Sequence, residues 1–252
     1  MNVTGDYKGV GDIAHIAVQA TAYTVNDVGS DGALTTQDNV LTDVSLTVDK
    51  KKDVTLEVLE LPTNVQAFQT RFKDFPDNAG QALREKIESD ILNLVRADIT
   101  QAQGDGLGNL GEDELLAAIM TLAQAKLPIL KNPSEFTFAF QPEQFPPLKK
   151  SGMIDFNRTG QAGNGGAASM GLPALYNIPT VFTNQVESSA SVHYNVLLHR
   201  DAFAWAAQKM PTFLTASGLA NAKLTRILHM HTLYGIKTVV AARAVILKSK
   251  DA

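Results

Sequence analysis

The sequence contains no cysteine among its 252 residues. Disulfide bonds and thiolate metal sites are therefore excluded. Charged residues make up 19% of the chain, which is below the roughly 25% of an average soluble protein. A surface with few charges gives little repulsion between neighbouring copies, and this mildly favours assembly. The formal net charge of −4 predicts no strong binding to the phosphate backbone of nucleic acids.

Targeting and membrane signals are also missing from the sequence. Residues 1–11 have neither the basic start nor the apolar core of a signal peptide. No apolar run approaches the length of about 20 residues that a membrane-spanning helix needs. We therefore expect a soluble chain that is made in a cytoplasm and does not contact a membrane.

The usual motifs of catalysis and cofactor binding are absent as well. The sequence has no Gly-x-Ser-x-Gly motif and no Gly-x-Gly-x-x-Gly motif that follows a predicted strand. The glycine-rich residues 157–171 lack the ending of a phosphate-binding loop, so we predict a mobile surface loop there. Acidic residues 112–114 open a predicted helix, where the helix dipole favours negative charge. We predict no catalytic residues, no cofactor and no metal; an enzyme with an unrecognised site is the alternative.

The five histidines give one candidate for metal binding. His229 and His231 would point to the same face of a strand, because side chains alternate along a strand. Two histidines on one face can hold half of a metal site. No third ligand stands at a recognisable spacing, so a structural or surface pair is the favoured interpretation.

What the sequence does contain is a long helical pattern over residues 77–103. Asn78 and Gln81 have the spacing of a capping box, which predicts the start of the helix. Apolar residues follow at helical spacing until Gly104. At about 1.5 Å per residue such a helix would be roughly 37 Å long. It suits the spine of a flat subunit, although the pattern taken alone favours an ordinary long helix of an α+β domain.

Two runs of alternating apolar and polar residues, 40–49 and 54–61, flank a charged stretch. This pattern predicts a β-hairpin over residues 40–61 with a charged tip. Charged tips deter aggregation, so solvated lysines are the simpler interpretation. The alternative is an inter-subunit contact, in which the tip meets acidic groups of a neighbouring copy; its residues would be Lys50, Lys51, Lys52 and Asp53.

The remaining elements are predicted from shorter patterns. Residues 1–38 are polar, with one apolar piece that predicts a strand or an arm lying on a neighbour. A second helix is predicted over residues 111–127. Two long strands are predicted near the C-terminus, over residues 224–233 and 236–247, with Tyr234-Gly235 between them. Further strands are predicted at residues 134–141, 178–182 and 192–198, and short helical pieces at residues 62–75, 144–150 and 200–208.

In this order, the elements resemble the major capsid proteins of tailed bacteriophages, whose fold is called Hong Kong 97-type. The resemblance covers nearly all of the chain beyond residue 38. The N-terminal arm is short for that family, and no inserted surface domain or scaffolding segment is visible. The stretches that carry the resemblance are Leu46-Thr47-Val48-Asp49-Lys50-Lys51-Lys52, residues 79–103, Gly171-Leu172-Pro173 through Ile178-Pro179-Thr180-Val181, Asn195-Val196-Leu197-Leu198-His199-Arg200-Asp201-Ala202-Phe203 and Leu233-Tyr234-Gly235-Ile236-Lys237.

The resemblance implies an α+β fold of the Hong Kong 97 type and a division of the chain. The division has an N-terminal arm (1–38), an extended β-hairpin loop (39–64), a peripheral domain with the spine helix (65–107 and 223–252) and an axial domain (108–222). It also implies a structural protein that self-assembles into pentamers and hexamers of an icosahedral virion shell around double-stranded DNA. Portal, scaffolding or decoration proteins are the further expected partners. The alternatives are an encapsulin-like compartment and another virion structural protein.

Overall fold

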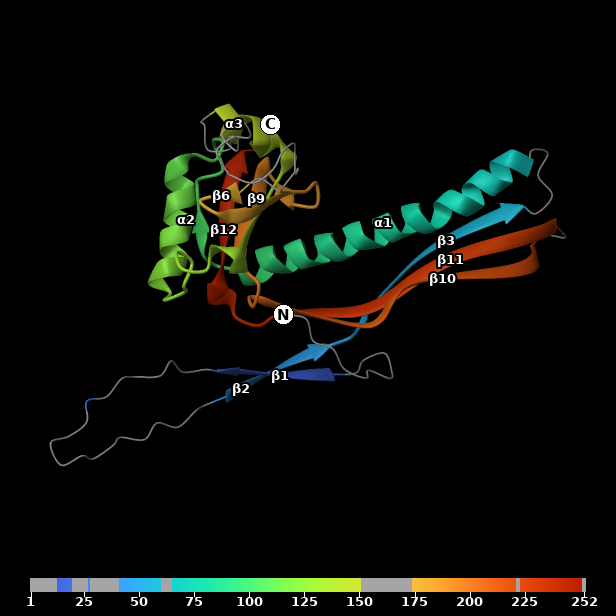
Figure 1. The fold of residues 1–252 in the computed structure, drawn as a ribbon, viewed down its shortest axis with the longest axis horizontal. Helices are drawn as coiled ribbons and strands as arrows, with labels where there is room; N and C mark the ends of the chain where they lie inside the picture. The colour runs from blue at the N-terminus through green and yellow to red at the C-terminus, as the bar shows by residue number, and fades with distance from the viewer. Residues whose placement is uncertain are drawn as a thin grey trace, which may run out of the picture.

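The computed structural model describes residues 13–19, 27, 41–59, 65–150, 174–220 and 223–250. These residues form three parts, which Figure 1 shows from the side. We call them the lobe, the extended part and the ribbon. The lobe is compact and contains most of the short strands, the extended part is a long helix lying along a narrow sheet, and the ribbon is a two-stranded hairpin.

The extended part consists of helix α1 (Val65–Asp98) and a sheet with the strand order β10-β11-β3. The strands are β3 (Lys50–Leu59), β10 (Phe203–Ala220) and β11 (Lys223–Thr238), and all neighbours are antiparallel. A helix of 34 residues is about 51 Å long. Its first half packs on the sheet, where Phe75, Ala79 and Leu83 contact Leu228 and Met230.

The lobe is built on a sheet with the strand order β4-β12-β9-β5-β7-β6, and β8 pairs with β9. Helices α2 (Glu112–Gln124) and α3 (Phe145–Lys150) contribute to one core with this sheet. The last turns of α1 form a second core with it through Leu92 and Val95, and Ile99 just after the helix joins them. The strands are β4 (Ala102–Gln103), β5 (Phe136–Phe140), β6 (Ala174–Leu175), β7 (Ile178–Phe182), β8 (Ser188–Ser189), β9 (Val192–His199) and β12 (Ala244–Lys250), and short 3-10 turns lie at η1 (Pro133–Glu135), η2 (Pro142–Gln144) and η4 (Ala241–Arg243).

The ribbon pairs β1 (Ile13–Gln19) with β2 (Leu41–Thr47) in antiparallel register. Its inner face packs over β10 and β11 close to the lobe, where Ile16 and Leu46 contact Ala204 and Ala206. In Figure 1 the ribbon then runs beneath the lobe, in the direction opposite to the extended part. The described strands of the ribbon therefore lie against the sheet at its end near the lobe, and Leu41 at their outer end is 56% exposed.

The predicted hairpin over residues 40–61 is wrong in its pairing. Strands form on both sides of the charged stretch, but β2 pairs with β1 and β3 pairs with β11. Val48, between the two strands, is fully buried in the core beneath the ribbon. Alternation predicts a strand and its buried face, but it does not specify the partner strand. The hairpin-like pairing that residues 41–47 do make is with β1, in the ribbon.

Long-range packing also overturns three predicted boundaries. Helix α1 begins at Val65 and includes Pro76, so the capping-box start at Asn78 is wrong. Residues 200–208 are not helical, because Ala204 and Ala206 face the ribbon from strand β10. Tyr234-Gly235 lies inside the continuous strand β11 instead of joining two strands.

Gly235 has a different role from the predicted turn. A Cβ at this position would lie 2.2 Å from the backbone oxygen of Thr47. The end of β2 therefore crosses β11 at a distance that only glycine permits. A dipeptide that is typical of turns marks a backbone crossing here.

The shorter lobe elements are confirmed. The second helix, the strands at residues 134–141, 178–182 and 192–198 and the short helix at 144–150 all form, with ends shifted by a few residues. The glycine-rich residues 157–171 and most of the N-terminal residues 1–38 lie outside the described residues. In the part of the chain that the structure describes, no helix combines the length and the apolar character needed to cross a membrane.

Candidate assembly surfaces and the buried polar sites

The charged stretch that was predicted as a hairpin tip leads to a buried carboxylate, Asp90. Asp90 is only 8% exposed and lies in α1. Lys50 Nζ lies 3.3 Å from one carboxylate oxygen, and Lys86 Nζ lies 3.0 Å from the other. The hydroxyl of Tyr234 donates a hydrogen bond of 2.8 Å to the oxygen that Lys50 contacts. One carboxylate therefore joins α1, β3 and β11.

The surroundings of Asp90 hold it in the charged form. Burial alone would raise the pKa of its carboxyl, but hydrogen bonds from Lys86, Tyr234 and Lys50 outweigh that cost and leave the pKa below its usual value. The pKa of the Tyr234 hydroxyl is raised, first by burial and then by its hydrogen bond to Asp90. At neutral pH the site therefore contains a charged carboxylate and a neutral phenol.

The predicted contact residues are divided between the two faces of the extended sheet. Lys50 and Lys52 are paired in register with the buried Tyr234 and Thr232, so they lie on the face that α1 covers. Lys51 and Asp53 are exposed and point to the opposite face. The ammonium of Lys50 is held by Asp90 of its own chain. The contact of Lys50, Lys51, Lys52 and Asp53 with a neighbouring copy stays a prediction.

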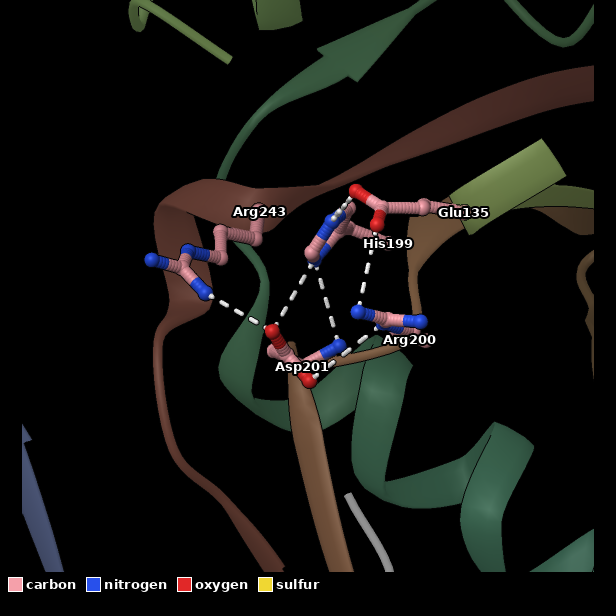
Figure 2. A network of polar contacts seen from close by, with 5 residues as sticks. All are labelled: Glu135, His199, Arg200, Asp201 and Arg243. Carbon is pink, nitrogen blue, oxygen red and sulfur yellow. Dashed lines mark hydrogen bonds and ion pairs between the residues drawn. The ribbon is translucent and has the colours of Figure 1, made fainter. Parts of the chain in front are cut away.

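A second polar cluster lies where the chain passes between the lobe and the extended part (Figure 2). Its members are Glu135 of η1, His199 at the end of β9, Arg200 and Asp201 in the following turn, and Arg243 of η4. Arg200 Nη2 lies 3.1 Å from Glu135 Oε1, and Arg243 Nη1 lies 3.5 Å from Asp201 Oδ2. This junction cluster fastens the β9–β10 turn and the segment that leads from β11 back into β12.

Hydrogen bonds indicate the tautomer of His199. The backbone N–H of Asp201 donates to Nδ1 at 3.2 Å, so Nδ1 carries no proton. Nε2 then donates to Glu135 Oε2 at 3.4 Å. The ring is 5% exposed and packs edge-on against Phe136 at 4.7 Å between centroids. A buried imidazole with both nitrogens engaged orients the elements that meet at the junction.

His229 and His231 lie on one face of β11, as predicted. Their rings stack at 5.0 Å between centroids, and His229 Nδ1 lies 2.8 Å from the hydroxyl of Thr55. Burial lowers the pKa of His231, and the charges of Lys209, His229 and Lys51 lower it further, against an opposing effect of Asp53. The described residues contain no cluster of three or more potential metal ligands. The neighbouring lysines would also repel a metal cation.

The face of the extended sheet that carries these histidines is only partly covered. Near the lobe the ribbon lies on it, but farther along it exposes Leu214 (47%) and Ile227 (36%). Thr55, His229 and Leu214 stand side by side across the three strands there. An apolar and weakly polar sheet face that remains open in one copy is typical of a protein interface.

A shallow groove lies between β3 and the first half of α1. It has a volume of about 410 Å³, and Leu56, Phe75 and Ala79 are among its lining residues. Among its lining residues in the described part of the chain, the exposed Asp74 is the one with a charged side chain. Catalytic pockets bring together several polar groups with perturbed pKa values, and this groove does not.

Comparisons with known proteins point to a single fold. No protein-family model matches the chain, and no curated protein matches it. Among solved structures, the capsid of Ralstonia phage GP4 is similar over 100% of this chain and 87% of that chain, with a TM-score of 0.66 at 11% identity. A structure from Mycobacterium phage Che8 covers 94% and 84%, with a TM-score of 0.62 at 19% identity. The capsid of cyanophage P-SCSP1u covers 96% and 84%, with a TM-score of 0.61 at 12% identity.

The chain has a phage capsid fold. The α+β capsid fold predicted from the order of the elements is thereby confirmed. The coverage shows that the similarity includes the lobe, the extended part and the ribbon together. Within the capsid fold of this chain, sequence reasoning missed the Asp90 site. One signal was present: Asp90 stands seven residues after the buried Leu83, on the apolar stripe of the helix.

Proposed function

We propose that this chain is the major subunit of an icosahedral virion shell that encloses packaged double-stranded DNA. The observation that supports this most is the match of 94–100% of the chain to solved phage capsid structures. In this proposal copies assemble in the host cytoplasm into pentamers and hexamers of the Hong Kong 97 type. Portal, scaffolding or decoration proteins would be the further partners.

Each part of the molecule has a separate role in this proposal. The lobe corresponds to the axial domain and clusters around five-fold and six-fold centres. The extended part corresponds to the peripheral domain, and we also assign β10 to it, because β10 pairs with β11. The ribbon reaches over a neighbouring copy from its outer end, where Leu41 is 56% exposed. Many repeated contacts of modest strength would hold the shell together.

The role is structural rather than catalytic. Both buried polar sites join elements of the chain and are enclosed by it, since Asp90 and His199 are 8% and 5% exposed. The groove between β3 and α1 offers no set of converging polar groups. The net charge of −4 suits DNA that is held by confinement instead of by direct binding.

Expression of the chain followed by negative-stain electron microscopy and gel filtration tests the proposal. Closed shells or ring-shaped pentamers and hexamers are expected, alone or after co-expression with a candidate scaffolding protein. Shells that contain protein cargo in place of DNA would support the encapsulin-like alternative. A species that stays monomeric in every condition, and that turns over a substrate, would contradict the proposal.

A further inference from the structure

The two edges of the extended sheet differ in charge. β3 forms one edge and carries five charged residues among its ten. β10 forms the other edge and carries one, Lys209, among its 18 residues. An edge strand presents unpaired backbone N–H and C=O groups, and natural proteins use charged side chains to prevent other strands from adding there. The β3 edge has this protection, and the β10 edge lacks it.

The unprotected part of β10 is its distal half. Pro211 cannot donate a backbone hydrogen bond, and the register against β11 shifts beside it. Beyond it, residues 212–220 pair with β11 without interruption and contain no charged residue. Leu214, Thr215 and Ala216 are exposed in succession. Because successive side chains point to opposite faces, this run of exposure shows that residues 214–216 are open on both faces of the sheet.

We propose that residues 212–220 of β10 pair in antiparallel register with the same residues of a second copy. Two identical strands can always pair in this way about a two-fold axis, with each contact occurring twice. Charged side chains along an edge deter the addition of another strand, so this pairing favours an uncharged segment. Residues 212–220 carry no charge, whereas five of the ten residues of the β3 edge are charged.

Residues 212–220 are placed where they could join two copies that belong to different lobe clusters. In Figure 1 the distal half of β10 lies at the end of the molecule that is farthest from the lobe. Contacts between lobes and contacts at the β10 edge can therefore form at the same time, with different neighbours. The pairing joins two extended sheets into one continuous sheet and covers the exposed Leu214. It needs two copies and no shell, so it does not depend on the proposed function.

Cysteine cross-linking tests the pairing directly, because the natural chain contains no cysteine. Single variants such as Leu214→Cys, Thr215→Cys and Ala216→Cys, extended over residues 212–220, are mixed in pairs and oxidised. Directly opposed residues in an antiparallel pair have Cα atoms about 4.5–5.5 Å apart, which lies within the range of roughly 4.4–6.8 Å that a disulfide bond spans. Glu57→Cys, exposed on the β3 edge, is the matched control.

If the strands pair, disulfide bonds should form only between the positions that lie opposite each other in one register. Covalent dimers should form best for pairs of positions whose residue numbers have one constant sum, with a yield at least about ten-fold above the Glu57→Cys control. That pattern in purified protein without shells would support the pairing and leave the proposed function unsupported. Shells that form normally, with no pair of β10 positions above the control, would overturn the pairing and leave the proposed function standing.

Discussion

The lobe and the extended part bury their sheets in different ways. In the lobe, α2 and α3 cover one face and the last turns of α1 cover the other, so both faces lie in closed cores. In the extended part α1 covers one face, while the ribbon covers the other face only near the lobe. The sheet of the lobe is therefore covered on both faces within one copy, whereas the extended part leaves part of its sheet open.

This difference indicates where neighbouring copies matter most. A sheet that is closed on both faces gains its stability within the chain, and its folding needs no partner. A sheet with an open face and a free edge gains further burial only from another molecule. We therefore expect the lobe to be the more stable region of the single copy. The extended part and the ribbon should bury the most additional surface when copies assemble.

The largest expected effect is a difference in stability loss between a core substitution in the lobe and one in the extended part. Phe138 is fully buried in the lobe and stacks on Phe140 at 5.2 Å between centroids. Phe138→Ala should lower the free energy of unfolding by about 3–5 kcal/mol, the usual range for a buried phenylalanine. Phe213 in the extended part is partly exposed. Phe213→Ala should therefore lower the free energy of unfolding by only roughly 1–2 kcal/mol. Chemical denaturation of the unassembled protein measures both, and equal losses would erase the contrast between the regions.

The next effect concerns the crossing of the ribbon over β11. In Gly235→Ala the new Cβ would meet the backbone oxygen of Thr47 at 2.2 Å, so the ribbon must move away from the sheet. The expected loss is about 1–3 kcal/mol, together with failure to assemble. Gly108→Ala is the matched control, because nothing lies within 4 Å of its Cβ. Thermal unfolding compares the two, and normal stability and assembly of Gly235→Ala would show that the crossing is unimportant.

A third effect tests the site that joins α1 to β3 and β11. Asp90→Asn removes the charge that Lys50, Lys86 and Tyr234 contact. Because both lysines are partly exposed, the expected loss is about 1–2 kcal/mol at pH 7. Glu85→Gln, at an exposed position on the same helix, should change stability by less than about 0.5 kcal/mol.

The loss caused by Asp90→Asn should depend on pH in one direction. The pKa of Asp90 is lower in the folded chain than in the unfolded chain, so its stabilising effect is present in full above the unfolded value of about 3.9. It disappears as the pH falls through the lower folded pKa. Denaturation curves at a series of pH values should therefore bring the two proteins together in acid. A difference that stayed constant to the lowest pH would show that the charge of Asp90 contributes nothing.

The smallest expected change in stability is at Ile227, where a substitution should nevertheless weaken assembly. Ile227→Gln makes the open sheet face more polar at a residue that is 36% exposed. The free energy of unfolding of the unassembled chain should change by less than about 0.5 kcal/mol. Sedimentation should nevertheless show weaker assembly, while Ile227→Val, which keeps the position apolar, should assemble normally. Equal assembly of both variants would mean that this part of the face stays open to solvent in the assembled form.

The same contrast explains how much of the fold could be predicted from the sequence. The lobe elements are short, are bounded by residues such as Gly111, Pro128 and Pro142, and were predicted with small errors in their ends. Their patterns are local, and local patterns are what a sequence displays directly. The order of the elements was enough to predict the capsid fold.

The extended part was predicted less well because its structure depends on distant partners. Residues 50–59 alternate as a strand should, but their partner is β11, more than 160 residues later in the chain. The alanines of residues 204–207 favour a helix by propensity, yet pairing with β11 makes them part of a strand. Helix α1 continues through Pro76 because Phe75 and Ala79 both pack on the sheet. None of these partners could be identified from local spacing.

The candidate site shows the same limit. Lys50 was singled out for its charge, but its partner Asp90 was not recognised, because 40 residues separate them. The junction cluster in Figure 2 brings together residues of three separate segments. His199 and its neighbours carried no motif that would mark them. One signal could have been used: Asp90 is a charged residue at a helix position that the apolar spacing predicts to be buried.

Hydrogen–deuterium exchange, compared between the unassembled and the assembled chain, tests the central claim most directly. Amide protection reports local stability along the chain, so it separates the two regions in one experiment. The account predicts that β5, β9 and β12 of the lobe core are protected in both forms, and that β10, β11 and the ribbon gain protection on assembly. Equal protection of the extended part in both forms, or a gain confined to the lobe core, would contradict it.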